Sequence, residues 1–466
     1  MNRRFFHVLT LATLLSGCTM IPKYERPPAP VSHSWPAGST ATNTTNTVAA
    51  DMDWREFFDD PRLQRLIELA LENNRDLRIA ALRVEETRAQ YRIQRAALFP
   101  GVEGHASYTR QKFSGAVTTF GGGATLTTYS LDVGASYEAD LFGRVRSLKK
   151  EALEKYFASD EARKSVHIAL VSQVATEYLT QLRLLQAKAV ANQTLKIVQS
   201  SYDLIKRRFE VGAASELELQ TAEGQVQAVR VNSADFLQML AASENALVVL
   251  VGQPLPKDLP AGKPFQQQHL LADLPAEVPS EVLHRRPDIV AAEHTLMAAN
   301  ANIGAARAAF FPRILLTGSG GTASAKLSDL FTGPSLTWNF SPQITVPIFD
   351  VGGTRGKLAV SKIERQIQIA NYEKAIQTAF KEVADALAGR AILDEKLRAQ
   401  ELLLNSQQKR FDLTTARYQQ GVDNYVDVLL AQRDLYAAQQ NLLQYQAARL
   451  LNAVTLYRSL AGGWKS

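Results

Sequence analysis

A run of about 65 residues, from Val145 to Arg208, contains neither glycine nor proline and constrains the fold of this chain more than any other feature. Its apolar residues are spaced by three or four positions, as in the contact line of a coiled coil. A helix of this length extends over roughly 100 Å, whereas an average globular helix has about 11–12 residues. An ordinary compact domain is therefore excluded. The clearest apolar series is Val171, Val174, Tyr178, Leu182, Leu185 and Ala189.

A segment with β-strand alternation precedes this helix, from Tyr129 to Phe142. Successive side chains of a strand point to opposite faces, so the predicted strand has one apolar and one charged face. The segment Leu336 to Ile348 alternates in the same way and carries Trp338 and Phe340 on its apolar face. In the first strand the apolar series is Tyr129, Leu131, Val133, Ala135, Tyr137, Ala139 and Leu141, and the polar series is Ser130, Asp132, Ser136, Glu138 and Asp140.

The N-terminus has the features of a secretory signal. Two arginines precede an apolar run from Phe5 to Leu15, and small residues lead to Cys18, the only cysteine. Leu15 to Cys18 resembles the bacterial lipobox, which implies a lipid on Cys18 and, with Thr19 next, delivery to the outer membrane. An unlipidated secretory signal is the alternative. No later apolar run reaches 18 residues, so we expect no membrane-spanning helix, and strands would have to make any crossing.

The pattern of elements occurs twice. Asp76 and the run Arg95 to Pro100 return 212 residues later as Asp288 and Arg307 to Pro312. We predict a tandem duplication of helix, β-hairpin, long helix, turn and helix, in which two shorter helices laid end to end match one long helix. The predicted parts are a signal peptide at 1–17, a lipidated tether at 18–50, a first repeat at 51–252 (β-hairpin 101–142, long helix 144–210, helix 214–251), a proline-rich linker at 253–280, and a second repeat at 281–466 (β-hairpin 313–349, long helix 353–419, helix 424–460).

Composition and motifs argue against several classes of protein. The net charge of +6 is not gathered in any basic block, which disfavours nucleic-acid binding. The seven histidines lack metal-ligand spacing, and the chain has no Walker loop, G-x-S-x-G or H-E-x-x-H motif. We expect no enzyme, no metal site and no cofactor other than the covalent lipid on Cys18.

The apolar face of the strands has two interpretations. A globular sheet would cover it with a core, whereas a membrane sheet would expose it to lipid, with Tyr and Trp at the interfaces. Outer-membrane delivery and the lack of another crossing element favour the membrane. Strands in lipid must close, because an open edge leaves backbone groups unpaired, and the four strands of one chain are too few. Copies of the chain would supply 8, 12 or 16 strands around a polar lumen that the helices continue.

At this point the chain resembles the outer-membrane factors, the TolC-like exit ducts, and among them the lipidated members of RND-type multidrug efflux systems. The resemblance covers essentially the whole chain and is carried by Arg285 to Ile289, Asn300 to Pro312 and Leu460 to Trp464. It implies a mixed α/β membrane protein: a homotrimer with a 12-stranded transmembrane β-barrel, continuous with a long periplasmic coiled-coil tunnel. It further implies an outer-membrane lipoprotein of a Gram-negative bacterium that works with a periplasmic adaptor and an inner-membrane transporter, and that catalyses nothing itself.

The resemblance also implies functional residues at the two helical turns far from the membrane, Arg208 to Glu218 and Arg417 to Asp427. Gly212 and Gly421 serve in any case as the turn glycines between helices. Ala213 departs from the larger apolar residue common there. The residues that the resemblance implies for adaptor binding are Arg208, Val211, Gly212, Ala213, Arg417, Gly421 and Val422.

A gate is implied at the same turns. Asp427 matches the acidic ring of the family, in which three copies around a narrow axis would attract cations. The family has a second acid one turn later, where this chain has Leu430, so a single acidic layer beside an apolar one is expected. Tyr418 matches a tyrosine that latches inner to outer helices, with Glu218 at the matching acidic position; ordinary packing is the alternative. Arg433 is a weaker candidate for the lumen.

Three other functions remain open from the sequence. The chain could be a periplasmic coiled-coil spacer that conducts nothing, or an exit duct for metal ions or secreted proteins. Methionines are few and dispersed, which counts against metal export. Conductance would separate a duct from a spacer.

Overall fold

The computed structural model describes residues 19–32, 35, 52–114, 123–270 and 285–462. Contacts divide the chain into two compact units. Unit 1 is Met1–Pro28, Arg83–Asp160 and Ala291–Glu373, and unit 2 is Ala29–Leu82, Glu161–Val290 and Lys374–Ser466. Each unit thus draws segments from both predicted repeats. The predicted signal peptide and Cys18, most of the tether, and the end of the linker lie outside the described residues.

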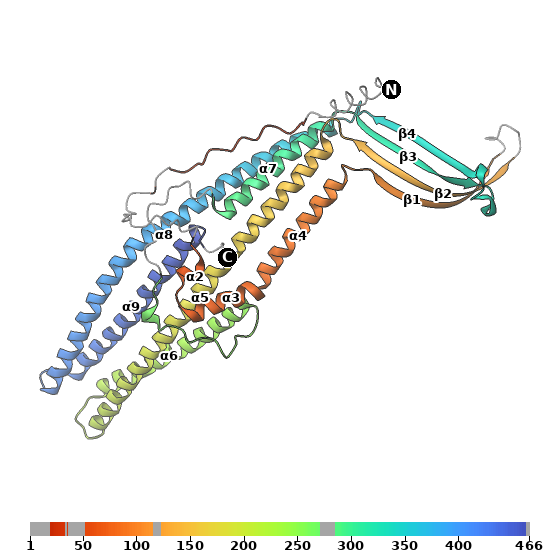
Figure 1. The fold of residues 1–466 in the computed structure, drawn as a ribbon. Coiled ribbons are helices and arrows are strands. Elements are labelled where there is room, and N and C mark those ends of the chain that lie inside the picture. Colours follow the sequence, from red (N-terminus) through yellow and green to blue (C-terminus); the bar gives the residue numbers. More distant parts are fainter. Residues whose placement is uncertain (1–18, 33–34, 36–51, 115–122, 271–284, 463–466) are drawn as a thin grey trace. The chain divides into compact units, whose positions relative to one another are not determined.

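Unit 1 contains an antiparallel four-stranded sheet in the order β1-β2-β3-β4 (Figure 1). Its strands are β1 (Gly101–Phe113), β2 (Ala124–Ala139), β3 (Arg313–Ser324) and β4 (Leu336–Thr345). β4 is shorter than the segment predicted to reach Ile348, because Pro347 has no N–H to donate to a ladder. Two 3₁₀ turns, η4 (Leu327–Asp329) and η5 (Gly333–Ser335), lie between β3 and β4.

The register separates the two faces of the sheet. Tyr108 pairs with Tyr129, Val133 with Gly320, and Gly320 with Trp338, which places the apolar series on one face. His105 pairs with Asp132, and Ser319 with Asn339, on the other face. Trp338 is 80% exposed and Val133 58% exposed, so no core of this chain covers the apolar face.

Two continuous helices of 67 residues each are α5 (Arg144–Glu210) and α8 (Gly353–Gln419), and these bounds coincide with the predicted ranges. Each begins after a glycine with positive φ, Gly143 and Gly352, where the chain leaves the sheet. α4, α5, α7 and α8 contribute residues to both units. The other helices are α2 (Trp54–Phe57), α3 (Pro61–Asn73), α4 (Arg75–Ala96), α6 (Glu216–Val251), the 3₁₀ turn η2 (Phe265–Gln267), α7 (Pro287–Ala308) and α9 (Tyr425–Ser459).

The apolar contact line predicted along α5 is correct only for its first half. Val171, Val174 and Tyr178 are buried, but Leu185 is 49% exposed, and Leu184 is buried instead. A straight helix of 3.6 residues per turn drifts by about 20° per heptad from a 3.5-residue repeat. The line chosen at Val171 therefore rotates off the core within two heptads.

The expectation that no helix could span a membrane was wrong by length and composition. α6 contains an 18-residue window with a mean hydropathy of 1.4 and at most two charged residues. A count of consecutive apolar residues missed it because charged side chains interrupt the run. Core helices of soluble proteins pass the same test, and Ala222, Val226 and Leu247 of α6 are buried in this chain.

The core of unit 2 is aromatic where the N-terminal helices meet the C-terminal end of the chain. Phe57 stacks on Tyr457 with ring centroids 4.1 Å apart. Asp60 caps α3 and accepts a hydrogen bond from Tyr178 Oη at 2.9 Å, although it is almost fully buried. These contacts fasten the start of the described chain to its end.

The segment predicted as a tether is docked over its first part. In unit 1, residues 20–26 follow α7 from residue 307 back to residue 293, which is about 21 Å of helix against about 20 Å of extended chain. The segment is therefore fully stretched along α7. The bonds are Arg307 Nη1 to Met20 O (3.2 Å), Asn300 Nδ2 to Pro22 O (2.8 Å), Tyr24 Oη to Glu293 Oε1 (3.0 Å), Arg26 Nε to Glu293 Oε1 (2.7 Å) and Arg26 Nη2 to Glu293 Oε2 (2.8 Å).

Candidate functional site

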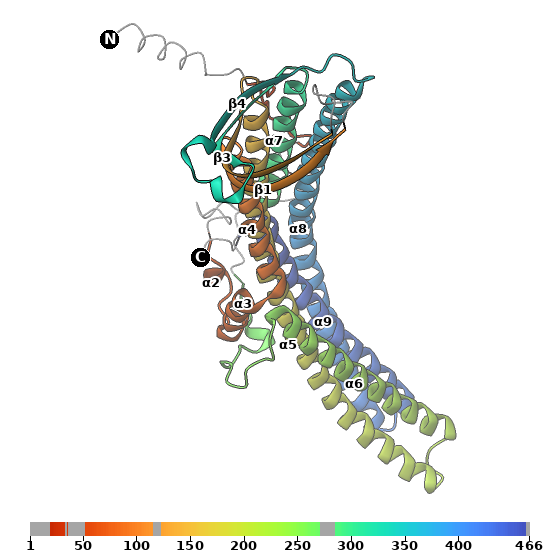
Figure 2. The ribbon, with the colours of Figure 1, turned by 90° about the vertical axis from the view of Figure 1, so that its right-hand side faces the viewer.

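The predicted site residues gather at the turns of two antiparallel helical hairpins in unit 2, α5–α6 and α8–α9 (Figures 1 and 2). In the first turn, Gly212 has φ +76° and its N–H donates to Phe209 O at 2.9 Å, while the Ala213 N–H donates to Arg208 O at 2.7 Å. This pair of bonds is a Schellman motif, which satisfies the last carbonyls of a helix. No other atom lies within 4 Å of a Cβ placed on Gly212, so the backbone conformation alone requires glycine.

The second turn repeats this geometry. Gly421 has φ +75°, its N–H donates to Tyr418 O at 2.9 Å, and the Val422 N–H donates to Arg417 O at 3.0 Å. The two turns that the sequence matched at an offset of 209 residues therefore have the same backbone hydrogen bonds.

The acids proposed for the gate begin the helices that follow these turns. Ser215 caps α6 in a capping box, in which the Glu218 carboxylate accepts from the Ser215 N–H at 2.7 Å. Asn424 caps α9 by accepting from the Asp427 N–H at 3.1 Å. The Asp427 carboxylate is exposed and has no hydrogen bond to any residue that the structure describes. Asp427 is therefore the free acid of the pair, and Glu218 serves its own helix end.

Arg208 and Tyr418 connect the two hairpins. The Arg208 guanidinium donates to the Tyr418 hydroxyl and, at 3.2 Å, to Ala213 O. The Tyr418 ring packs against Tyr425 with centroids 4.8 Å apart. Within this chain the expected partner of Tyr418, Glu218, bonds to Ser215 instead.

An apolar cluster lies beneath this contact and joins α5, α6 and α9. Burial raises the pKa of the Tyr425 phenol, and Gln225 Nε2 donates to Leu429 O at 2.5 Å. The hairpins are thus held together by apolar packing, with the Arg208–Tyr418 bond at the outer limit of the contact. The buried members are Ile205, Ala222, Tyr425, Val428 and Leu429, against which Tyr202, Ala214, Leu219, Phe411 and Tyr418 pack.

Sequence reasoning missed an ion pair across the second turn. Arg417 donates to both carboxylate oxygens of Asp423, at 2.7 and 2.8 Å. Hydrogen bonding to Arg417 lowers the pKa of Asp423, and the same bond raises the pKa of Arg417. The only advance signal was a pair of opposite charges six residues apart across a turn glycine. The first turn has Ala214 where this pair would need an acid.

The remaining predicted residues are on the surface of the turns. Val211 is 79% exposed and Val422 is 60% exposed. Leu430 is half-buried, and Arg433 is exposed and pairs with Asp434 at 3.0 Å. Each turn therefore presents an apolar side chain next to a glycine, which is suited to contact with another protein.

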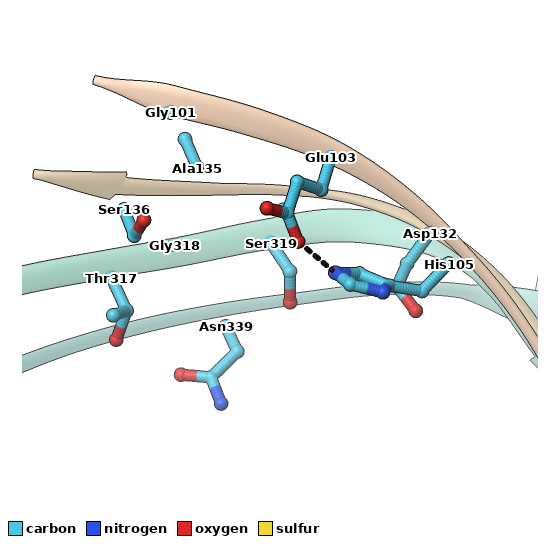
Figure 3. Close-up of a pocket in the computed structure, with 11 residues that line it drawn as sticks. Gly101, Glu103, His105, Asp132, Ala135, Ser136, Thr317, Gly318, Ser319 and Asn339 are labelled. Carbon is cyan, nitrogen blue, oxygen red and sulfur yellow. Dashed lines mark ion pairs between the residues drawn. The ribbon is translucent and has the colours of Figure 1, made fainter. Parts of the chain in front are cut away.

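The polar face of the sheet forms a shallow pocket in unit 1 (Figure 3). Glu103 and His105 of β1, Asp132 of β2, Ser319 of β3 and Asn339 of β4 lie on this one face, and the His105 and Glu103 side chains are 3.9 Å apart. Across the described parts of both units, no group of three or more His, Cys, Asp or Glu residues could hold a metal ion.

Comparison with known proteins agrees with this geometry. The family model for the outer membrane efflux protein matches residues 66–253 and 278–462. The antibiotic efflux pump outer membrane protein ArpC of Pseudomonas putida is 45% identical over 468 residues, covering 100% of this chain and 96% of that protein. The toluene efflux pump outer membrane protein TtgC, from another strain of Pseudomonas putida, has the same identity and coverage.

A crystal structure of the open state of the MtrE outer membrane channel of Neisseria gonorrhoeae has a TM-score of 0.87. It is 40% identical, and the match covers 96% of this chain and 99% of MtrE. The resemblance drawn from the sequence motifs is confirmed: this chain belongs to the outer membrane efflux protein family, whose members are transport proteins of the outer membrane rather than enzymes.

Proposed function

We propose that three copies of this chain assemble into a gated exit duct that carries small toxic compounds across the outer membrane. The observation that carries the proposal is the sheet, which has an exposed apolar face, an exposed polar face and two edge strands, β1 and β4. A sheet of this kind is stable in lipid only when its edges are paired and its polar face is enclosed.

Closure requires β1 of one copy to pair with β4 of the next. Four strands per chain give 12 strands for three copies, which is wide enough to enclose a lumen. The likeness to an outer membrane channel supports this arrangement. α4 precedes β1 and α8 follows β4, so the same neighbours would bring exposed apolar residues of α4 against those of α8, for example Ile93 and Ile363.

The helical part would continue the lumen and narrow at the two turns. Three copies of Asp427 would form an acidic ring that attracts cations, with Leu430 as an apolar layer one turn away. The Arg208–Tyr418 bond would hold the hairpins in the closed arrangement, because opening must separate them. Glu218 and Arg433 would contribute charge near the ring without closing it.

The exposed parts of the two turns would bind a periplasmic adaptor protein, which connects the duct to an inner-membrane transporter of the RND type. Apolar contacts at exposed glycine turns suit a helical partner that approaches end-on. The residues concerned are Arg208, Val211, Gly212, Ala213, Arg417, Gly421 and Val422.

Antibiotics and toluene are in the names of two relatives, which supports small toxic organic compounds as the cargo class. A lipid on Cys18 would anchor the chain in the membrane. Two separate matches to one family model, before and after the linker, support descent of the chain from a tandem duplication.

The proposal is tested by efflux from cells. Cells that lack this chain should accumulate a fluorescent hydrophobic dye, and expression of the wild-type chain should restore the low level. Native mass spectrometry of the same protein in detergent should give three times the chain mass. A monomeric protein, or accumulation that the chain does not lower, would contradict the proposal.

A further inference from the structure

Charge is distributed unequally between the two ends of the sheet. At the end that leads into the helices, cations and acids neutralise one another: Arg144 pairs with Glu138 at 2.7 Å, and Arg146 with Asp140 at 3.2 Å. Arg313 also pairs with Glu138 at 2.7 Å. Each cation here has its acidic partner within the chain.

At the opposite end, where the hairpins turn, the cations have no such partners. Arg110 and Lys112 of β1 are exposed, and neither has a hydrogen bond or ion pair to a residue in the described part of the chain. The sequence contains no Asp or Glu between Glu103 and Asp132. Lys326, two residues beyond the end of β3, adds a third cation at this end. The nearby acid, Asp329, bonds to Ser328.

Arg110 and Lys112 lie on the apolar face of the sheet, not on its polar face. Alternation places them with Val102, Ala106 and Tyr108. The register pairs Arg110 with Thr127, on the same face as Tyr129. The rings of Tyr108 and Tyr129 contact each other at 4.9 Å between centroids, and aromatic pairs of this kind mark the border between hydrocarbon and headgroups.

The dimensions agree with this border. The apolar series of β2 from Tyr129 to Ala139 spans about 34 Å along the strand, or about 24 Å of height at a tilt near 45°. An outer-membrane barrel has an apolar band about 25 Å high. The two cations lie two and four residues beyond Tyr108, which is roughly 5–10 Å higher and therefore among the headgroups.

We propose that Arg110 and Lys112 bind phosphate groups of the lipopolysaccharide that forms the outer leaflet, with Lys326 adding to the positive field. A guanidinium and an ammonium on the lipid-facing side, without acids of their own, complement a phosphorylated glycolipid headgroup. Three copies would repeat the pair around the barrel. The inference rests on the proposed function only in that the apolar face must contact lipid.

The test measures binding of fluorescent lipopolysaccharide to the purified protein in neutral detergent. Arg110→Gln/Lys112→Gln should bind roughly 20-fold more weakly than wild type, as expected for two cations at an anionic surface. A matched control, Thr109→Arg/Arg110→Thr/Gln111→Lys/Lys112→Gln, keeps the composition and charge but moves both cations to the polar face. It should be as weak as the double variant.

Chemical arms identify the source of the phosphate. Dephosphorylated lipopolysaccharide should bind wild type no better than it binds the double variant, and millimolar inorganic phosphate should not displace the intact glycolipid. Equal binding of all three proteins would overturn the proposal, as would a control that binds like wild type. Displacement by inorganic phosphate would reduce the pair to a general anion site and would also overturn it.

Channel conductance separates this inference from the proposed function. All three proteins should conduct alike in a neutral bilayer if they fold. Wild-type protein that binds lipopolysaccharide through this pair but never conducts would contradict the duct and leave the lipid contact standing. Normal conductance with unchanged lipid binding would do the reverse.

Discussion

Single residues decide the two turns on which the proposed function depends. The glycines could be predicted from the sequence, because a break between two long apolar helices needs one residue at positive φ. The partners of the charged residues could not. Arg208 bonds to Tyr418, 210 residues away, and only the packing of two hairpins brings them together. Arg417 and Asp423 are close in sequence, but their pairing depends on the turn geometry.

Replacing the turn glycines should destabilise the protein through backbone strain alone. Gly212→Ala and Gly421→Ala each force a Cβ into the left-handed region, with open space around it, at a cost of about 1 kcal/mol. Gly224 lies inside α6, also in open space, and Gly224→Ala should stabilise by up to about 1 kcal/mol. Urea unfolding would measure both effects. The account of the turns is wrong if all three substitutions shift stability in the same direction.

Removing the buried charge beneath the N-terminal segment should release that segment. Glu293 is 6% exposed and holds Arg26 and Tyr24, so Glu293→Gln should cost about 1–2 kcal/mol and expose residues 19–28 to protease. Glu25→Gln is the control, because Glu25 is exposed and lies 3.9 Å from Lys23. Equal cleavage rates in the two variants would show that Glu293 does not hold the segment.

Whole elements follow from sequence more closely than contacts do. α5 and α8 have the predicted bounds because no breaker interrupts them, and the strands have two faces because their side chains alternate. The docking of residues 20–26 could not be foreseen, since proline-rich sequence is typical of a free tether and the partners lie on α7. The contact line of α5 was misplaced because helical drift accumulates with length.

The second turn should loosen in acid. Hydrogen bonds from Arg417 lower the pKa of Asp423, so the unfolded chain takes up this proton at a higher pH than the folded turn. The stabilisation is therefore complete above the ordinary aspartate pKa and is lost as the pH falls through the lowered value. Hydrogen exchange at residues 420–424, corrected for intrinsic rates, should lose protection over that range. Asp423→Asn should remove the pH dependence, and its persistence there would contradict the assignment.

A charge on the apolar face of the sheet should be costly only if that face contacts lipid. Val133→Lys should destabilise the sheet in lipid vesicles by about 2–4 kcal/mol, the range for a lysine at the middle of a barrel's outer face. Asp132→Lys places the same side chain one residue away, on the polar face, and should cost much less. Urea titration in vesicles would compare them. Equal costs would mean that lipid does not cover the Val133 face.

At the scale of the whole molecule, family and location follow from the comparisons, while assembly and gating remain predictions. One chain supplies four strands with two open edges and two helical hairpins with exposed turns. Both features need partners: copies of the chain for the edges and, in our proposal, an adaptor for the turns. The sequence indicated this need because it contains a membrane face without enough strands to close a barrel.

Single-channel conductance in a planar lipid bilayer tests the central claim most directly. Wild-type protein should give a low, cation-preferring conductance, because Asp427 and the Arg208–Tyr418 bond keep the turns narrow and acidic. Asp427→Ala should reduce the cation preference, and Tyr418→Phe should raise the conductance by removing the hydroxyl that Arg208 binds. Trimeric protein that conducts in no variant would contradict a duct gated at these turns, and it would favour a spacer that passes nothing.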